Sequence, residues 1–135
     1  MPYRVLVCGG RDFDDAERVW SVLDHYHREA GGFEALISGS ARGADTIAAE
    51  WADARGIRVL PFPADWNDLH AQPCVTRRRE NGDFYNALAG LNRNTRMLRE
   101  GLPTLVIAFP GGSGTADMVR KSRMAKVSVL EIPRT

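Results

Sequence analysis

Glycine, serine and threonine gather in one short segment of the chain, Pro-Gly-Gly-Ser-Gly-Thr at residues 110–115. The segment follows the apolar residues 105–108 and precedes a stretch with helical periodicity, which predicts a turn between a buried strand and a helix N-terminus. The first amides of a helix have no partner inside the helix, and glycine lets a phosphate approach the backbone closely. The segment therefore predicts an anion site, or a turn that needs only the conformational freedom of glycine.

Two further segments combine glycine with arginine in the same kind of position. Residues 9–12 follow the apolar residues 4–8, and residues 39–45 follow the apolar residues 35–38. Arginine presents a planar fork of donors that matches phosphate and carboxylate groups. The candidate ligand-binding residues of the three loops are Gly9, Gly10, Arg11, Asp12, Gly39, Ser40, Arg42, Gly43, Asp45, Pro110, Gly111, Gly112, Ser113, Gly114 and Thr115.

The elements that must position these loops alternate between short apolar runs and helical patterns, which is typical of a parallel α/β sheet. Strands are predicted at about residues 4–8, 35–38, 58–62, 104–109 and 128–132, and helices near 14–30, 43–55, 87–100 and 114–126. We therefore predict one Rossmann-like, three-layer α/β domain over residues 1–135, with a five-stranded, mainly parallel sheet.

The expected strand order brings the three loops together. Sheets of this kind bind ligands at the carboxyl ends of their strands, where the strand order reverses. With the order 3-2-1-4-5, the reversal lies between the first and fourth strands, and the loops lie side by side at one edge. Their clustering favours an anionic, phosphorylated ligand over three unrelated turns.

Composition excludes several classes of protein. The chain has 135 residues, 44% of them hydrophobic and 26% charged, with a formal net charge of +1, so no strong bias toward nucleic acid follows. Cys8 and Cys74 form neither a disulfide framework nor a metal motif, which favours a reducing cytoplasm. No signal peptide or membrane span is expected, because the chain contains no run of about eighteen apolar residues.

Known nucleotide and metal motifs are missing from the candidate loops. The glycine-rich segment has no P-loop lysine, and the first loop lacks the spacing of a dinucleotide fingerprint. His25 and His27 diverge on a helix and His70 stands alone, so no metal is predicted. No cofactor is predicted beyond a ligand that is itself a nucleotide or an NAD derivative.

Residues 64–86 interrupt the alternation with a long polar excursion that contains Arg77, Arg78 and Arg79. Long connections are usually functional or mobile, so residues 64–86 are either a solvated loop or a lid over the ligand. Trp66 is either a solvated loop residue or a surface on which a base stacks. For Asp45, helix capping and ribose binding are equal alternatives, and Asp12 could likewise be a turn or cap residue.

Several of these motifs recur in an order that resembles a known family. They are residues 7–13, 39–45 and 63–66, then Arg93 and Asn94 with Met97, then residues 108–117. Together they resemble the YspA-type (cpYpsA-related) family of the SLOG superfamily, along nearly the whole chain. The resemblance implies a nucleotide, nucleotide sugar, ADP-ribose or NAD derivative bound over the Pro-Gly-Gly loop. Trp66, Arg93 and Asn94 are candidates for a lid or a base-stacking surface. Relatives often form homo-oligomers, so self-association is open.

More distant relatives imply two alternative functions. LOG-type phosphoribohydrolases place a glutamate two residues after the Gly-Thr, where this chain has Asp117, so Asp117 is the candidate catalytic residue of a hydrolase. Its side chain is one methylene shorter than glutamate, which changes its reach to a ribose. The DNA-processing protein of natural transformation suggests binding of single-stranded nucleic acid through Arg77, Arg78 and Arg79. The near-neutral charge makes nucleic acid an unlikely partner, and we expect binding or sensing of a small phosphorylated ligand.

Overall fold

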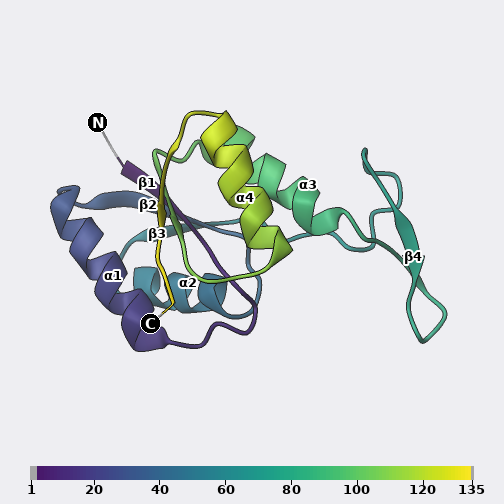
Figure 1. Cartoon of the computed structure of the whole chain (residues 1–135), viewed down its shortest axis with the longest axis horizontal. Helices are drawn as coiled ribbons and strands as arrows, with labels where there is room; N and C mark the ends of the chain where they lie inside the picture. Colours follow the sequence, from purple (N-terminus) through teal and green to yellow (C-terminus); the bar gives the residue numbers. More distant parts are fainter. Residues whose placement is uncertain (1–2, 135) are drawn as a thin grey trace.

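The parallel sheet predicted from the sequence forms the centre of the protein (Figure 1). The computed structural model describes residues 3–134. The sheet runs in the order β3-β2-β1-β6-β7, and every neighbouring pair is parallel. Its strands are β1 (Tyr3–Cys8), β2 (Phe33–Ser38), β3 (Arg58–Pro61), β6 (Leu105–Ala108) and β7 (Ser128–Glu131). The predicted fold class and strand order are confirmed, and all five strands are parallel.

Helices cover both faces of the sheet, which explains why its strands read as continuous apolar runs. Val5 and Val7 pack with residues of α1 (Ala16–Glu29) and α2 (Ala44–Ala54) in one core cluster. Leu6 and Cys8 point to the other face and pack with Met97 and with residues of α4 (Ser113–Met124). On that second face, α3 (Ala89–Arg96) continues into a π-helical turn at Met97–Gly101. Cys8 therefore ends β1 on the face covered by α3 and α4.

The helices differ in how they begin, and this difference bears on the ligand site. Asp15 caps α1 in the ordinary way, since its side chain accepts a hydrogen bond from the backbone amide of Arg18 at 3.1 Å. The caps of α2 and α4 are Gly43 and Gly112, which supply no side-chain hydrogen bond. The first amides of α4 therefore have no side-chain cap from the residue before them.

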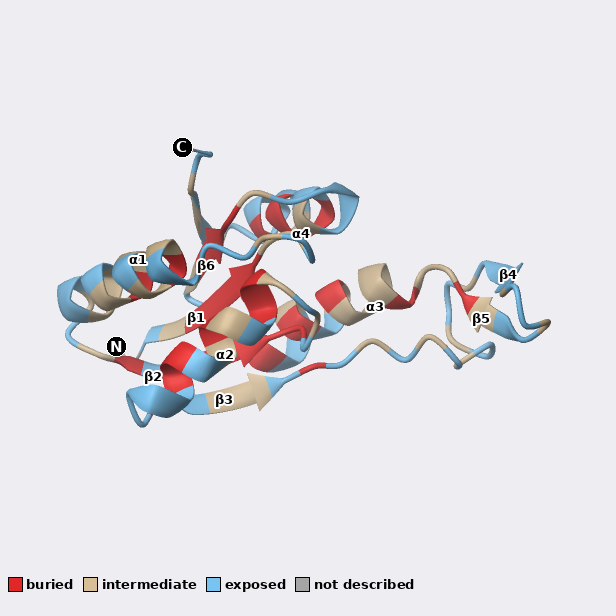
Figure 2. Ribbon diagram, turned by 90° about the horizontal axis from the view of Figure 1, so that it is seen from below, coloured by how far each residue is buried: buried red, intermediate tan, exposed pale blue. Residues whose placement is uncertain are grey.

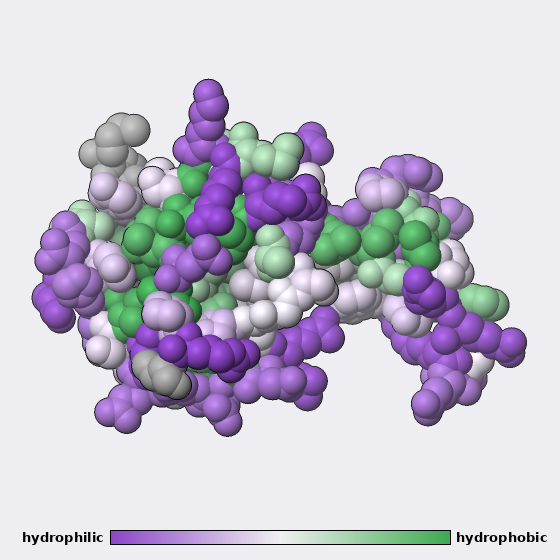
Figure 3. All heavy atoms as spheres, viewed as in Figure 1, coloured by the Kyte–Doolittle hydropathy of each residue, from purple (hydrophilic) through white to green (hydrophobic). Residues whose placement is uncertain are grey.

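Residues 64–86 form an arm that extends away from the sheet (Figure 1, Figure 2 and Figure 3). The arm contains an antiparallel hairpin that the sequence did not predict, made of β4 (Thr76–Arg78) and β5 (Phe84–Asn86). Asn86 anchors its base, because its buried side chain accepts hydrogen bonds from the amides of Val75 at 3.2 Å and Leu88 at 3.0 Å. The excursion is therefore a structured projection rather than a plain loop.

The part of the chain that the structure describes contains neither a candidate membrane span nor a candidate metal site. Within residues 3–134, no helix has the length and apolar character that crossing a bilayer requires. The same residues bring no group of three or more His, Cys, Asp or Glu side chains together where a metal ion could be held.

Candidate functional site

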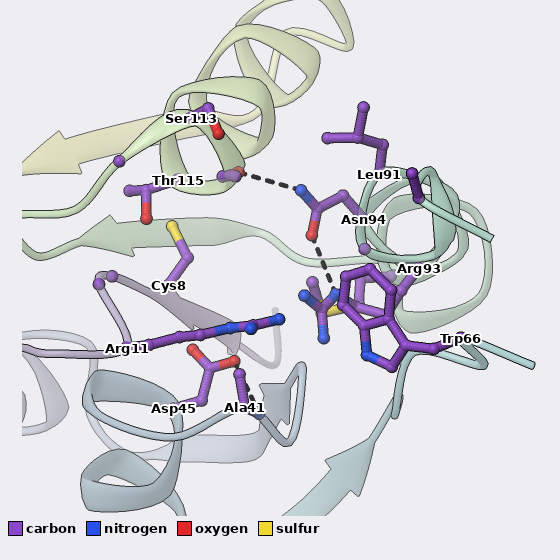
Figure 4. Close-up of a pocket in the computed structure, with 17 residues that line it drawn as sticks. Cys8, Arg11, Ala41, Asp45, Trp66, Leu91, Arg93, Asn94, Ser113 and Thr115 are labelled. Carbon is purple, nitrogen blue, oxygen red and sulfur yellow. Dashed lines mark hydrogen bonds between the residues drawn. The ribbon is translucent and has the colours of Figure 1, made fainter. Parts of the chain in front are cut away.

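A cavity of about 430 Å³ opens at the carboxyl edge of the sheet, where the strand order reverses between β1 and β6 (Figure 4). Its size is within the range of small-molecule sites in proteins, about 300–1,000 Å³. The predicted residues that line it are Gly9, Gly10, Arg11, Asp45, Trp66, Arg93, Asn94, Gly112, Ser113, Gly114 and Thr115. We call this space the main cavity.

The remaining predicted residues lie elsewhere. Gly39, Ser40 and Arg42 line a neighbouring, smaller cavity. Pro110 and Gly111 face a third hollow, which Arg134 and Glu131 also line. Asp12, Gly43 and Asp117 are absent from the lining of the main cavity. The structure thus brings together most, but not all, of the residues that the sequence singled out.

Three glycines hold the loops against one another, since a side chain at any of them would collide with the next loop. A Cβ at Gly9 would lie 2.6 Å from the Cβ of Ala44, and one at Gly111 would lie 2.7 Å from the amide nitrogen of Gly10. Gly43 has a φ of 77°, and a Cβ there would overlap the carbonyl oxygens of Gly10 and Arg11. These glycines serve loop packing, a role that the sequence analysis did not assign, and only Gly43 of the three also has a positive φ.

Gly112 and Gly114 differ from these three glycines, because a Cβ at either position would collide with none of the described residues. A Cβ added at Gly112 or Gly114 would meet no atom within 4 Å, and neither residue has a positive φ. Neither the backbone conformation nor the packing of the described residues therefore requires glycine there. Both residues line the main cavity at the N-terminus of α4. Open space beside the first turn of a helix is where an anion can approach the backbone amides.

Arg11 and Trp66 form one wall of the main cavity (Figure 4). The guanidinium carbon of Arg11 lies 5.4 Å from the centre of the Trp66 ring, a cation–π arrangement. Within residues 3–134 no carboxylate forms an ion pair with Arg11. Its positive charge is therefore available to a ligand.

Asp45 places a carboxylate in the main cavity, directed toward Arg11 (Figure 4). The residue is only 6% exposed, and Oδ2 accepts a hydrogen bond from the amide of Ala41 at 3.3 Å. No other hydrogen bond to this carboxylate is found among the described residues, which leaves Oδ1 as an acceptor. Burial raises the pKa of Asp45 to about 6, although the Ala41 amide and the charges of Arg93 and Arg11 act in the opposite direction.

Arg93 holds the loop after β2 in place. Its half-buried guanidinium donates to the backbone carbonyl oxygen of Gly39, and Nε donates to Oδ1 of Asn94 at 3.1 Å. Burial lowers the pKa of Arg93, while the neighbouring Asp45 favours its charged form. These contacts make Arg93 part of the cavity wall. We expected it at a lid or a base-stacking surface.

Asp117 lies on α4, where basic groups and Asn94 surround it. Its carboxylate accepts from Arg120 at 2.7 Å and from Nδ2 of Asn94 at 3.1 Å, and it pairs with Lys121 at 2.9 Å. Burial alone would raise the pKa of Asp117, but these hydrogen bonds outweigh burial and lower it. The carboxylate ties α4 to α3. A catalytic role for Asp117 stays a prediction, and this geometry does not favour it.

Some lining residues escaped the sequence-based prediction: Cys8, Ala41, Ala87, Gly90, Leu91 and Met97. Cys8 could have been found, because it is the last residue of β1, at the carboxyl edge of the sheet and on the face opposite Val7. Burial raises the pKa of its thiol to about 12, so it is a neutral wall of the cavity rather than a nucleophile. The apolar residues of α3 carried no signal distinct from core packing.

Solved structures share this architecture. DNA processing protein A (DprA) from Streptococcus pneumoniae superposes with a TM-score of 0.71 at 20% sequence identity, covering 99% of this chain and 51% of that chain. DNA processing protein A from Helicobacter pylori, described for its single-stranded DNA binding mode, superposes with a TM-score of 0.68 at 19% identity, covering 99% and 66%. At this identity the likeness shows the fold alone, and the chain spans about half to two thirds of these proteins.

The sequence of this chain also matches a known protein and the model of a family. Gene 61 protein of Mycobacterium phage D29 is 34% identical over 133 residues, which cover 94% of each chain. The model of the YspA, cpYpsA-related SLOG family matches residues 3–69, which include the loops after β1 and β2. The chain belongs to the YspA, cpYpsA-related SLOG family.

Proposed function

We propose that this protein binds a small phosphorylated, nucleotide-derived ligand in the main cavity. The observation that carries the proposal is the open space at Gly112 and Gly114, beside the first turn of α4, in the same cavity as Arg11, which forms no ion pair with a carboxylate among the described residues. A phosphate there would accept hydrogen bonds from the amides of the helix N-terminus and from the guanidinium. Thr115, which also lines the cavity, adds a hydroxyl donor.

The rest of the cavity suits the other parts of a nucleotide. Oδ1 of Asp45 can accept hydrogen bonds from ribose hydroxyls, and the Trp66 ring offers an apolar surface for a base. We propose binding or sensing rather than cleavage, because the structure provides Asp117 with protein partners on α4 and α3 and not with a place in the cavity lining.

The test is a titration of the protein with adenosine 5′-monophosphate, followed by calorimetry and by the melting temperature. Arg11→Ala is expected to weaken binding by about 10- to 100-fold, since a hydrogen bond to a charged group contributes about 1.5–3 kcal/mol. Arg58→Ala is the matched control, because Arg58 is an exposed arginine at the start of β3, on the opposite edge of the sheet.

Two outcomes would contradict the proposal. In the first, none of the ligands tested, namely a series of nucleoside monophosphates, ADP-ribose and NAD, shifts the melting temperature of the wild-type protein. In the second, Arg11→Ala and Arg58→Ala weaken binding equally, which would mean that the ligand responds to the general charge of the protein and not to the cavity.

Single-stranded DNA is a second candidate ligand, favoured by one structural observation. The arm exposes Phe84 at 53%, and the guanidinium of Arg78 lies 6.0 Å from its ring centre. Arginine and aromatic side chains together suit stacked bases and phosphates. The fold likeness to a DNA processing protein described for single-stranded DNA binding supports the same reading and weighs against the expectation that nucleic acid is an unlikely partner.

Filter retention of a labelled oligonucleotide tests this second candidate. Replacing Arg77 and Arg78 together with alanine is expected to reduce retention at least tenfold and to lessen its salt dependence. Arg79 stays unchanged, because it donates hydrogen bonds to Asn67 within the arm. Equal retention by the double variant and the wild-type protein, or no retention by either, would eliminate the arm as a DNA-binding surface.

A further inference from the structure

A second cavity of about 260 Å³ adjoins the main one, beyond Arg11 and Trp66. It lies over the carboxyl ends of β2 and β3, between the 39–42 loop and residues 63–64. Arg11, Ala41, Trp66 and Arg93 line both spaces. The two cavities are therefore neighbours that share one wall, and a single ligand can reach both across Arg11.

Arg42 gives the second cavity a positive charge that the main cavity does not share. Three arginines line the second cavity, namely Arg11, Arg42 and Arg93, and its lining contains no aspartate or glutamate. Asp45, which lines only the main cavity, partly compensates the charges of Arg93 and Arg11, whereas Arg42 lines only the second cavity. Within the described residues, Arg11 and Arg42 form no ion pair with a carboxylate. A guanidinium group beside a hollow attracts an anion when no neighbouring carboxylate compensates it, as holds for Arg42 among the described residues.

We propose that the second cavity is a second phosphate subsite, and that the ligand is a nucleotide carrying two separate phosphate groups. One phosphate would lie at the N-terminus of α4 in the main cavity. The other would lie against Arg42, while Arg11, which lines both cavities, donates to the first phosphate. This inference rests on the proposed function, because it assigns the first phosphate to the main cavity.

Two kinds of nucleotide carry this chemistry. In adenosine 3′,5′-bisphosphate, both phosphates are on one nucleoside, whereas in the dinucleotide pApA they are on successive nucleosides. Adenosine 5′-monophosphate has a single phosphate and serves as the reference ligand. Calorimetric titration of the wild-type protein with all three, at one fixed salt concentration, measures the contribution of the second phosphate and shows which spacing the two cavities accept.

We expect at least one of the doubly phosphorylated ligands to bind ten or more times more tightly than the monophosphate. Arg42→Ala is expected to abolish this preference while leaving affinity for the monophosphate within about twofold, because Arg42 lines only the second cavity. Arg58→Ala, the control introduced above, should keep the preference.

The possible failures are distinguishable. If the monophosphate binds but neither doubly phosphorylated ligand binds more tightly, the second subsite is wrong and the proposed function stands. If Arg42→Ala weakens the monophosphate as much as the doubly phosphorylated ligands, Arg42 acts through general charge and the second subsite is likewise wrong. If no ligand binds the wild-type protein, both proposals fail together.

Discussion

Replacing Asp45 with asparagine is expected to stabilise the protein above pH 6. The pKa of Asp45 is about 6 in the folded protein, against 3.8 for an ordinary aspartate, so the folded state holds a proton that the unfolded state releases between these values. Stability therefore falls as pH rises through this window and stays reduced above it. The full difference corresponds to about 3 kcal/mol.

Urea unfolding of the wild-type protein and of Asp45→Asn, measured in parallel from pH 4 to pH 8, checks this result. The free energies of unfolding should nearly coincide at pH 4 and diverge up to pH 7, with the variant the more stable. The asparagine keeps an oxygen for the Ala41 amide, so this contact should survive. A difference that does not change with pH would show that Asp45 is not held in a destabilised ionised form.

The Asp45→Asn variant also tests whether the destabilising carboxylate contacts the ligand. A buried carboxylate that costs the protein stability at neutral pH is typical of a functional site. If Oδ1 of Asp45 accepts from ribose hydroxyls, Asp45→Asn should bind adenosine 5′-monophosphate about tenfold more weakly, since a hydrogen bond to a charged group is lost. The wild-type preference for this ligand over its 2′-deoxy form should also shrink. Unchanged affinity would exclude contact between Asp45 and the ligand.

Replacing Gly43 with alanine is expected to lower the free energy of unfolding by about 3 kcal/mol or more. The φ of 77° is unfavourable for a residue with a side chain, which costs about 1–3 kcal/mol. The new Cβ would also overlap the backbone of Gly10 and Arg11 and force the two loops apart, at a further cost of about 1–3 kcal/mol. A shift in the midpoint of urea unfolding measures the total effect.

Gly114→Ala is the matched comparison on α4. Alanine favours a helix over glycine, so this variant should be as stable as the wild-type protein or more stable by about 0.5 kcal/mol. Its Cβ enters the open space at the main cavity and should weaken binding of adenosine 5′-monophosphate at least tenfold. Loss of stability in Gly114→Ala, or unchanged affinity, would contradict the distinction between packing glycines and ligand-facing glycines.

Parts of the fold could be predicted from sequence because the signals are local. Residues 105–108 form a buried strand and the glycines after them a turn, and these patterns need no knowledge of the rest of the chain. The hairpin at Thr76–Arg78 and Phe84–Asn86 escaped prediction because its residues are mostly exposed and lack a clear alternation of apolar and polar side chains. Asn86, which anchors it, makes contacts that follow from burial and not from residue type.

The division of roles between Asp45 and Asp117 shows where sequence reasoning ends. Both are acidic residues near the start of a helix that follows a glycine-rich loop, and both are buried. Only the contacts separate them: Asp117 meets Arg120 and Lys121 on its own helix, whereas Asp45 faces the cavity. The resemblance that pointed to Asp117 matched its position in the chain but could not show the direction of its side chain.

By itself, the sequence determined the parallel α/β order, the edge of the sheet at which the glycine-rich loops meet and the family, since apolar runs and ordered motifs carry that information. The tertiary structure alone decided which glycines pack loops and which face open space, and it revealed the second cavity. The physical reason is that these properties depend on distances between loops far apart in the chain. Gly43 and Gly114 are the same residue type at the start of a helix, and only their surroundings tell them apart.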